Sequence, residues 1–169
     1  MNEEWYDEEI NALVAQHGAV PPPYVAFPDT HPMEICWRMG AGESHMMVFS
    51  FWSAKARMNE AQWIEYFRKF PPPPLWLTWM ICCVWDLEDE DPGAEEPSLD
   101  PFEYDYWVYF RRTAALGFGT EWDCKHAWEE WDDNIDNGEE KEVMQEDGQE
   151  EQESEQEKGW EEKGWEEKG

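Results

Sequence analysis

Apolar side chains recur at the spacing of an α-helix along most of the chain. The first stripe consists of Tyr6, Ile10, Leu13, Val14 and His17. These positions share one face of a 3.6-residue period, so they predict a helix over residues 3–17. Acidic side chains crowd its first turns, where the helix dipole favours them, and Gly18 suits its C-terminal end.

Further stripes with the same spacing predict helices over residues 43–55, 59–70, 102–116 and 120–135. Asn59 and Thr120 are suitable N-caps, because their side-chain oxygens accept hydrogen bonds from the free N–H groups of a first turn. Four consecutive prolines, at 71–74, must end the helix over 59–70, since proline lacks the N–H that a helix interior needs.

The segment 75–85 is apolar on nearly every side, which is typical of a central buried element. Pro74 suits the first turn of a helix, so the pattern favours a helix here. Its length and its Val, Ile and Trp content also fit a buried strand. The alternative to an all-helical fold is therefore an α+β fold with short strands near 33–37, 75–85 and 104–110.

Prolines make the connections distinctive. The run at 20–28 contains four of them, which predicts an extended, polyproline-like path and excludes a helix. Gly40 and Gly42 are expected to break the path before the next helix. The sequence thus predicts a mostly α, compact bundle of five or six helices with Pro-rich connections over residues 1–138.

The remaining segment, 139–169, is composed largely of Glu, Gln, Lys and Gly and ends in a repeated Gly-Trp-Glu-Glu-Lys unit. So few apolar groups cannot offset the entropy cost of ordering, and this predicts a disordered tail. The tryptophans of the repeat, Trp160 and Trp165, have nothing nearby in sequence to pack on.

Charge narrows the range of partners. The formal net charge is −29, and the tail, with 14 acidic and 4 basic residues, accounts for −10 of it. The predicted helical domain keeps −19, so acidity belongs to the folded part as well. A field of this sign repels nucleic acid and membranes and favours basic proteins. Direct nucleic-acid or membrane binding is therefore not expected.

The N-terminus is acidic and lacks the apolar stretch of a signal peptide. The longest apolar run, Leu75 to Trp85, falls short of the roughly 20 residues that span a bilayer. A cytoplasmic location is therefore expected, and the four cysteines are expected to be free thiols. Their spacing includes no CxxC, and no HExxH occurs, so no metal or other cofactor is predicted.

The segment 31–45 is the strongest candidate for a ligand site, because it concentrates polar side chains around two glycines. Its candidate residues are His31, Glu34, Trp37, Arg38, Gly40, Gly42, Glu43 and His45. A Gly-rich turn that opens a helix can bind an anion through free N–H groups. However, no Walker lysine and no GxGxxG is present, and Glu43 would repel an anion. The structural alternative is a tight turn in which Arg38 pairs with a carboxylate.

No catalytic residue is predicted, since no GxSxG elbow occurs and Cys124 and His126 do not share a helix face. Two acidic runs are candidates for partner binding: Asp89, Glu90, Asp91, Glu129, Glu130, Asp132 and Asp133. They are either solvated faces that keep a Trp-rich protein dispersed or surfaces for a basic partner. We therefore expect a non-enzymatic acidic interaction protein, such as an inhibitor, an immunity-like protein or a nucleic-acid mimic. The alternative is a small ligand-binding or enzymatic domain centred on Arg38 and the Gly40–Gly42 turn.

Overall fold

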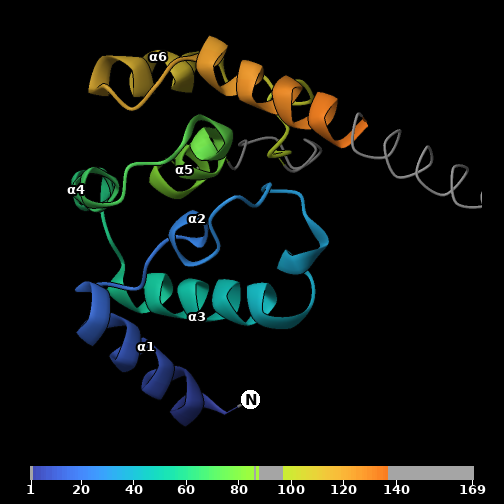
Figure 1. The fold of residues 1–169 in the computed structure, drawn as a ribbon. Coiled ribbons are helices and arrows are strands. Elements are labelled where there is room, and N and C mark those ends of the chain that lie inside the picture. Colours follow the sequence, from blue (N-terminus) through green and yellow to red (C-terminus); the bar gives the residue numbers. More distant parts are fainter. Residues whose placement is uncertain (1, 86, 88–96, 137–169) are drawn as a thin grey trace, which may run out of the picture. The chain divides into compact units, whose positions relative to one another are not determined.

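The computed structural model describes residues 2–85, 87 and 97–136, and within these ranges it contains helices and no strand (Figure 1). The chain divides into two units, residues 1–128 and 129–169, which are described separately below. The mostly α fold is thereby confirmed. The predicted tail, 139–169, lies outside the described residues.

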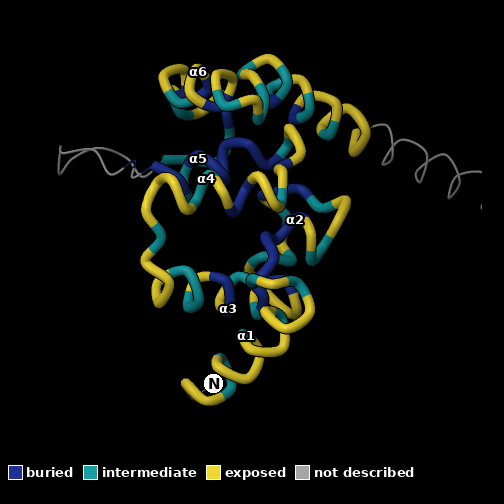
Figure 2. The backbone as a smooth tube through the Cα atoms, turned by 90° about the vertical axis from the view of Figure 1, so that its left-hand side faces the viewer, coloured by how far each residue is buried: buried dark blue, intermediate teal, exposed yellow. Residues whose placement is uncertain are grey.

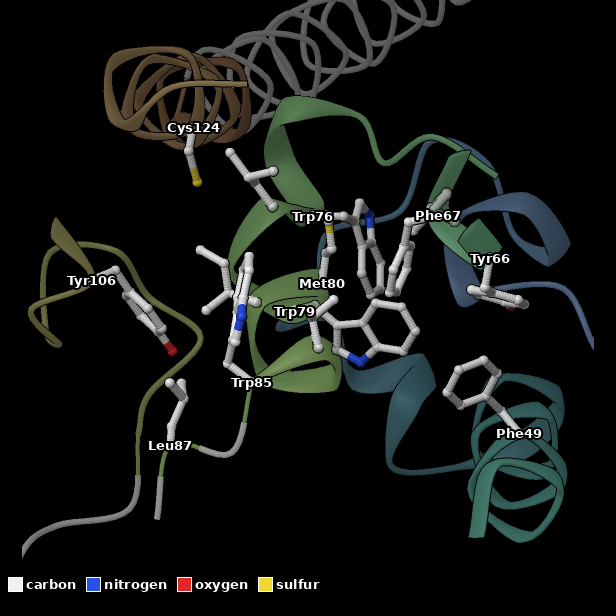
Figure 3. Close-up of a cluster of buried hydrophobic side chains, with 14 of the residues drawn as sticks. Phe49, Tyr66, Phe67, Trp76, Trp79, Met80, Trp85, Leu87, Tyr106 and Cys124 are labelled. Carbon is white, nitrogen blue, oxygen red and sulfur yellow. The ribbon is translucent and has the colours of Figure 1, made fainter. Parts of the chain in front are cut away.

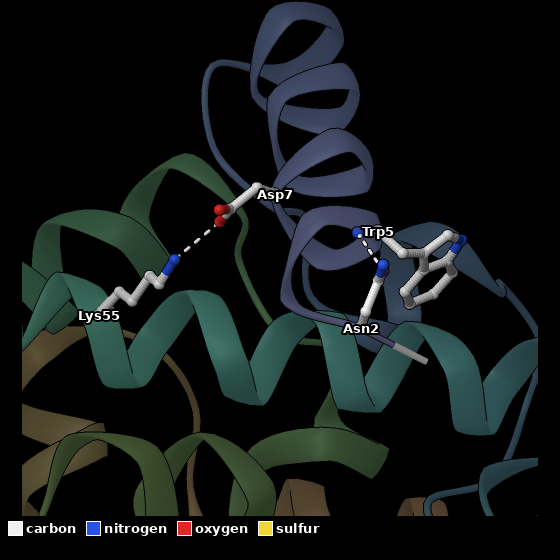
Figure 4. A network of polar contacts seen from close by, with 4 residues as sticks. All are labelled: Asn2, Trp5, Asp7 and Lys55. Carbon is white, nitrogen blue, oxygen red and sulfur yellow. Dashed lines mark hydrogen bonds and ion pairs between the residues drawn. The ribbon is translucent and has the colours of Figure 1, made fainter.

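The first helix, α1 (Glu3–His17), has the predicted bounds. The side chain of Asn2 caps it by accepting a hydrogen bond from the Trp5 N–H at 3.1 Å (Figure 4). Gly18 ends it in the left-handed conformation, with φ 80°.

The prolines at 20–28 do not exclude a helix entirely. One helical turn, α2 (Pro23–Ala26), lies inside this run, so the prediction of a wholly extended segment was wrong. The turn can form because Pro23 occupies the first helical position. An N–H at that position would have no partner inside the helix, and the fixed φ of proline is already helical.

The two glycines also behave differently from the prediction. A short 3₁₀ turn, η1 (Ile35–Trp37), is followed by α3 (Gly40–Ala56), so Gly40 and Gly42 lie in the first turn of the helix and not in a loop before it. A Cβ on Gly42 would lie 2.4 Å from the carbonyl oxygen of Cys36. Glycine is therefore required where α3 packs against η1.

The central part of the chain follows the predicted order. Helix α4 (Glu60–Lys69) begins with a capping box, in which Asn59 and Gln62 exchange side-chain-to-backbone hydrogen bonds. Four prolines follow, and the 3₁₀ turn η2 (Pro74–Trp76) leads into α5 (Leu77–Val84). The helical interpretation of 75–85 is confirmed, and the strand alternative was wrong.

Helix α6 (Trp107–Leu116) begins later than predicted, because aspartates hold the preceding residues in turns. The carboxylate of Asp100 accepts from the Phe102 N–H at 2.8 Å, and that of Asp105 accepts from the Trp107 N–H at 3.1 Å. The strands considered for 33–37 and 104–110 are absent from these described ranges.

Residues 121–128, the last part of the first unit, are helical, and Thr120 caps them as expected. Its hydroxyl accepts from the Asp123 N–H at 3.2 Å, while the Asp123 carboxylate accepts from the Thr120 N–H at 3.0 Å. In the second unit, residues 129–136 are helical.

The core of the first unit is aromatic and is built around α5. Leu77, Met80 and Ile81 are fully buried there, and Trp76, Trp79 and Phe67 gather beside them (Figure 3). The tube in Figure 2 shows the same division, with α5 mostly buried and α1 mostly exposed. Most of the tryptophan in the described residues thus serves packing.

The polar groups of several core side chains form hydrogen bonds to the backbone of the connecting segments and so hold these segments on the core. The donors are side chains, and the acceptors are backbone carbonyls of connections or of the turn η2. The pairs are Tyr66 with Val20 at 2.7 Å, Trp76 with Thr30 at 3.1 Å, Thr78 with Leu99 at 2.7 Å, Tyr106 with Ser98 at 2.6 Å and Trp128 with Leu75 at 3.1 Å. These bonds satisfy carbonyls that the helices cannot reach.

Candidate functional site

Both histidines of the candidate segment 31–45 are buried, and each packs against an aromatic ring. The side chain of His31 is 7% exposed, and its ring packs edge-on against Trp128 with centroids 4.3 Å apart. Its Nδ1 accepts a hydrogen bond from the Met33 N–H at 3.1 Å. His31 therefore holds a turn in place.

His45 is buried on α3, and its Nε2 donates to the carbonyl oxygen of Pro21 at 2.9 Å. Burial lowers the pKa of His45, and the nearby His17 lowers it further, while the bond to Pro21 opposes the shift. The ring is thus kept neutral more easily than an exposed histidine. Its contacts are those of a core residue, as the edge-on packing against Phe27 also shows.

Three other candidates do converge. Glu34, Trp37 and Arg38 line a cavity of about 260 Å³, which we call the Trp37 cavity. Its remaining walls are Pro32, Met33, Met46, Trp76, Trp79 and Leu99. It combines aromatic walls with one carboxylate and one guanidinium, which suits a small ring that carries a polar group.

The polar groups of this cavity are also used locally. The Glu34 carboxylate accepts from the His31 N–H at 2.8 Å, and the Trp37 indole donates to the His31 carbonyl at 2.7 Å. Arg38 is exposed. The predicted pairing of Arg38 with a carboxylate is not among the ion pairs of the described residues.

Gly40 and Gly42 have structural roles at the start of α3, where Gly42 allows close approach to η1. Glu43, from the same first turn, lines a different hollow. The structure therefore divides the candidate segment: a cavity around Glu34, Trp37 and Arg38, two packed histidines, and Glu43 on a separate surface.

That separate surface is a groove of about 510 Å³ between α1 and α3, which the sequence analysis missed. We call it the α1–α3 groove. It is lined by Tyr6 from α1, by Trp37 from η1, and by Glu43, Met46, Met47, Ser50, Phe51 and Ala54 from α3. Trp37 and Met46 line both hollows and form the wall between them. The signal in the sequence that could have found it is the doubled methionine, Met46 and Met47, within the helix predicted over 43–55.

The acidic candidates lie partly outside the described residues, since Asp89, Glu90 and Asp91 are not among them. Glu129, Glu130, Asp132 and Asp133 are exposed on the helical residues 129–136 of the second unit. Partner binding by either run stays a prediction.

Within the described ranges, no group of three or more His, Cys, Asp and Glu side chains is placed to hold a metal ion. All four cysteines are free thiols. Burial raises the pKa of Cys124 to about 12 and raises that of Cys83 well above its ordinary value. These thiols therefore stay protonated near neutral pH.

None of the helices in the described part of the chain is both long and apolar enough to cross a membrane. Comparison of the chain with protein-family models, with curated proteins and with solved structures finds no match.

Proposed function

We propose that this chain is an acidic interaction protein that binds a basic partner protein. In that role it acts as an inhibitor or immunity-type protein, or presents carboxylates in place of nucleic-acid phosphates. The observation that carries the proposal is the first half of α1. Glu3, Glu4, Glu8 and Glu9 are all exposed there.

These carboxylates are largely uncompensated by neighbouring cations. Lys55 pairs with Asp7 at 2.7 Å, and Lys125 pairs with Glu121 at 2.9 Å. The glutamates of α1 stand outside both pairs. They give the surface a field that speeds association with a basic protein and that salt weakens.

The test begins with affinity capture on the full chain from the native cell extract at low salt. The captured protein is then purified, and its Kd is measured at rising salt. Between about 0.02 M and about 0.3 M salt, the Kd is expected to rise at least about tenfold, because screening removes the long-range attraction.

Two variants locate the charge, one that removes four carboxylates from α1 and one that removes two from α4. E3Q/E4Q/E8Q/E9Q is expected to weaken binding and flatten its salt dependence, whereas E60Q/E65Q on α4 removes exposed charge elsewhere and is expected to change less. A Kd that stays constant across the salt range contradicts the proposal.

A second candidate function is supported by the Trp37 cavity, where Arg38 lies beside aromatic walls. It would take a small aromatic carboxylate, whose acid group would pair with the guanidinium. Ligand-observed NMR with a set of aromatic acids tests this function. If the function is correct, the Arg38→Met variant no longer binds these acids. The control variant Arg57→Met, which changes an exposed arginine away from the cavity, still binds them.

A further inference from the structure

The floor of the α1–α3 groove is set by an aromatic stack. The rings of Tyr6 and Phe51 are stacked, with an angle of 21° between their planes and centroids 4.8 Å apart. The Lys55 ammonium lies 4.6 Å from the Phe51 ring centroid and pairs with Asp7 at 2.7 Å (Figure 4). This contact fixes α1 on α3 at one end of the groove, so the hollow is a feature of packed helices.

Apolar side chains line the groove, and others are exposed within two residues of its Trp37 wall. Met47 is 39% exposed in the lining, and the neighbouring turn leaves Ile35 at 62% and Met39 at 60%. Exposed large apolar groups that lie together mark interaction surfaces. Methionine suits such a surface, because its flexible thioether adapts to different partner side chains.

The charge around the groove is negative. Glu43 belongs to its lining, and Glu3 lies one helical turn before Tyr6 on α1. Two cations lie nearby. Lys55 is paired with Asp7, and Arg38 lines the Trp37 cavity on the other side of the Trp37 wall. An apolar floor with an acidic rim is complementary to a segment with one apolar face and basic edges.

The length of the groove fits a helix. From Glu43 to Ala54 along α3 the axis rises by about 16 Å, which is about three helical turns. A helix of that length presents apolar anchors at spacings of three and four residues along one face. The acidic segment 139–169 of this chain, or a second copy, would bring charge of the same sign to the rim.

We propose that the α1–α3 groove binds a basic amphipathic helix of the partner protein. The apolar face of that helix packs on Met46, Met47 and Phe51, and its lysine or arginine side chains meet the acidic rim. This inference rests on the function proposed above and adds to it the place and the chemistry of the contact.

The experiment uses the full chain and three synthetic peptides of about 18 residues, long enough for five helical turns. The first contains leucine and lysine with the leucines on one helical face. The second has the same composition with the leucines scattered, and the third replaces every lysine of the first by glutamine. Binding is measured by calorimetry and by NMR of methyl-labelled methionine.

The amphipathic lysine peptide is expected to bind at least about tenfold more tightly than the scattered one, because only it buries a continuous apolar face. The methyl signals of Met46 and Met47 are expected to shift, whereas that of Met80, which is fully buried in the core, is not.

Two variants challenge the groove by opposite changes. Met47→Gln replaces an apolar anchor by a polar side chain of nearly equal size, and Ser50→Trp fills the hollow with a large ring. Each variant is expected to weaken binding about tenfold. Both positions are exposed on α3, so both variants are expected to fold. Val108→Gln, at a residue on α6 that is 42% exposed, is the control and is expected to bind like the wild type.

The outcomes separate the two proposals. If both lysine peptides bind equally and the groove variants bind like the wild type, the groove proposal is wrong and the charge-based function survives. If the glutamine peptide binds as tightly as the lysine peptide, irrespective of salt, the function proposed for the acidic surface is wrong. If none of the peptides binds, the groove proposal is overturned.

Discussion

Gly42 shows how strongly one missing side chain can be constrained. It lies inside α3, where exchange for alanine ordinarily stabilises a helix by about 1 kcal/mol. Here a Cβ would meet the Cys36 carbonyl, which is backbone and cannot rotate away. The close contact and the helix propensity therefore act in opposite directions at this position.

We predict that the close contact dominates and that Gly42→Ala lowers the free energy of unfolding by about 1–3 kcal/mol. Urea denaturation followed by circular dichroism measures it. Ala41→Gly, at the exposed neighbouring residue, is the control and should cost no more than about 1 kcal/mol. An alanine at position 42 that stabilises the protein would show that η1 and α3 do not approach as described.

His45 gives the protein a pH-dependent contribution to stability. In the unfolded chain its pKa is near 6.5, and burial lowers the pKa in the folded state. Above pH 6.5 both states are neutral at this residue. As the pH falls below 6.5 and through the folded pKa, the unfolded chain binds the proton more readily, so the folded state loses stability.

We predict that wild type loses stability relative to His45→Gln as the pH is lowered from about 8 to about 5. The glutamine can still donate to the Pro21 carbonyl but does not titrate in this range, and it costs about 1 kcal/mol at the higher pH. Urea denaturation of both proteins at several pH values is the measurement. Parallel pH profiles would mean that His45 titrates like an exposed histidine.

For single residues, the sequence predicts which side chains have the chemistry to form a site. It predicts less well where those side chains point. The grouping of Glu34, Trp37 and Arg38 followed from their closeness in the chain. The burial of His31 and His45 did not, because it depends on Trp128 and Pro21, which lie far away in sequence. The α1–α3 groove was missed for the same reason.

At the scale of elements, caps determine where the helices begin. Asn59 and Gln62 form a reciprocal pair at the start of α4, with side-chain-to-backbone distances of 2.9 and 3.0 Å. Replacement of Asn59 by alanine removes one of these bonds and leaves a first-turn N–H unsatisfied.

Asn59→Ala is predicted to lower the free energy of unfolding by about 1 kcal/mol. Thermal unfolding measures the effect, and Asn59→Ser, which keeps a capping oxygen, should recover most of it. Equal losses in the two variants would mean that the cap contributes little to α4.

The connection before α6 depends on a buried hydroxyl. Thr78 on α5 is fully buried and donates to the Leu99 carbonyl at 2.7 Å. Thr78→Val keeps the shape but leaves this carbonyl without its donor, so we predict a loss of about 1–3 kcal/mol. Thr78→Ser retains the hydroxyl and should lose less. Hydrogen exchange around residues 97–100 should rise in the valine variant alone.

The helical stripes predicted the main elements because their apolar positions pack against one core, as the confirmed bounds of α1 show. The predicted boundaries were wrong where a single residue, and not the helical spacing of the apolar positions, determines the local structure. Pro23 starts a turn instead of preventing one, Gly40 opens a helix, and Asp105 delays α6. Such boundaries depend on single hydrogen bonds and fixed dihedral angles, which periodicity does not report.

At the scale of the whole molecule, charge opposes folding. A net charge of −29 repels itself when the chain is compact, and the side chains of the pairs Lys55–Asp7 and Lys125–Glu121 are each at least 34% exposed, so these pairs offset little of the repulsion. Salt screens this repulsion over a Debye length of about 8 Å at physiological ionic strength.

We predict that raising sodium chloride from about 0.01 M to about 0.3 M increases the Tm by about 3 °C, which corresponds to about 1 kcal/mol for a chain of this size. Differential scanning calorimetry is the measurement. The E3Q/E4Q/E8Q/E9Q variant should show a smaller rise. A Tm that falls with salt would mean that attractive ion pairs outweigh the repulsion.

The hydrogen bonds from buried side chains to the carbonyls of connecting segments also affect how the chain can associate with other copies of itself. At the connection after α1, Pro21, Pro22 and Pro23 offer no N–H, and Tyr66 and His45 already occupy the carbonyls of Val20 and Pro21. A strand from another molecule would find no N–H donor at the three prolines, and the carbonyl oxygens of residues 20–23 already accept hydrogen bonds within the chain. A Trp-rich protein thereby carries, in one of its connections, a backbone that is a poor template for amyloid-like β-pairing.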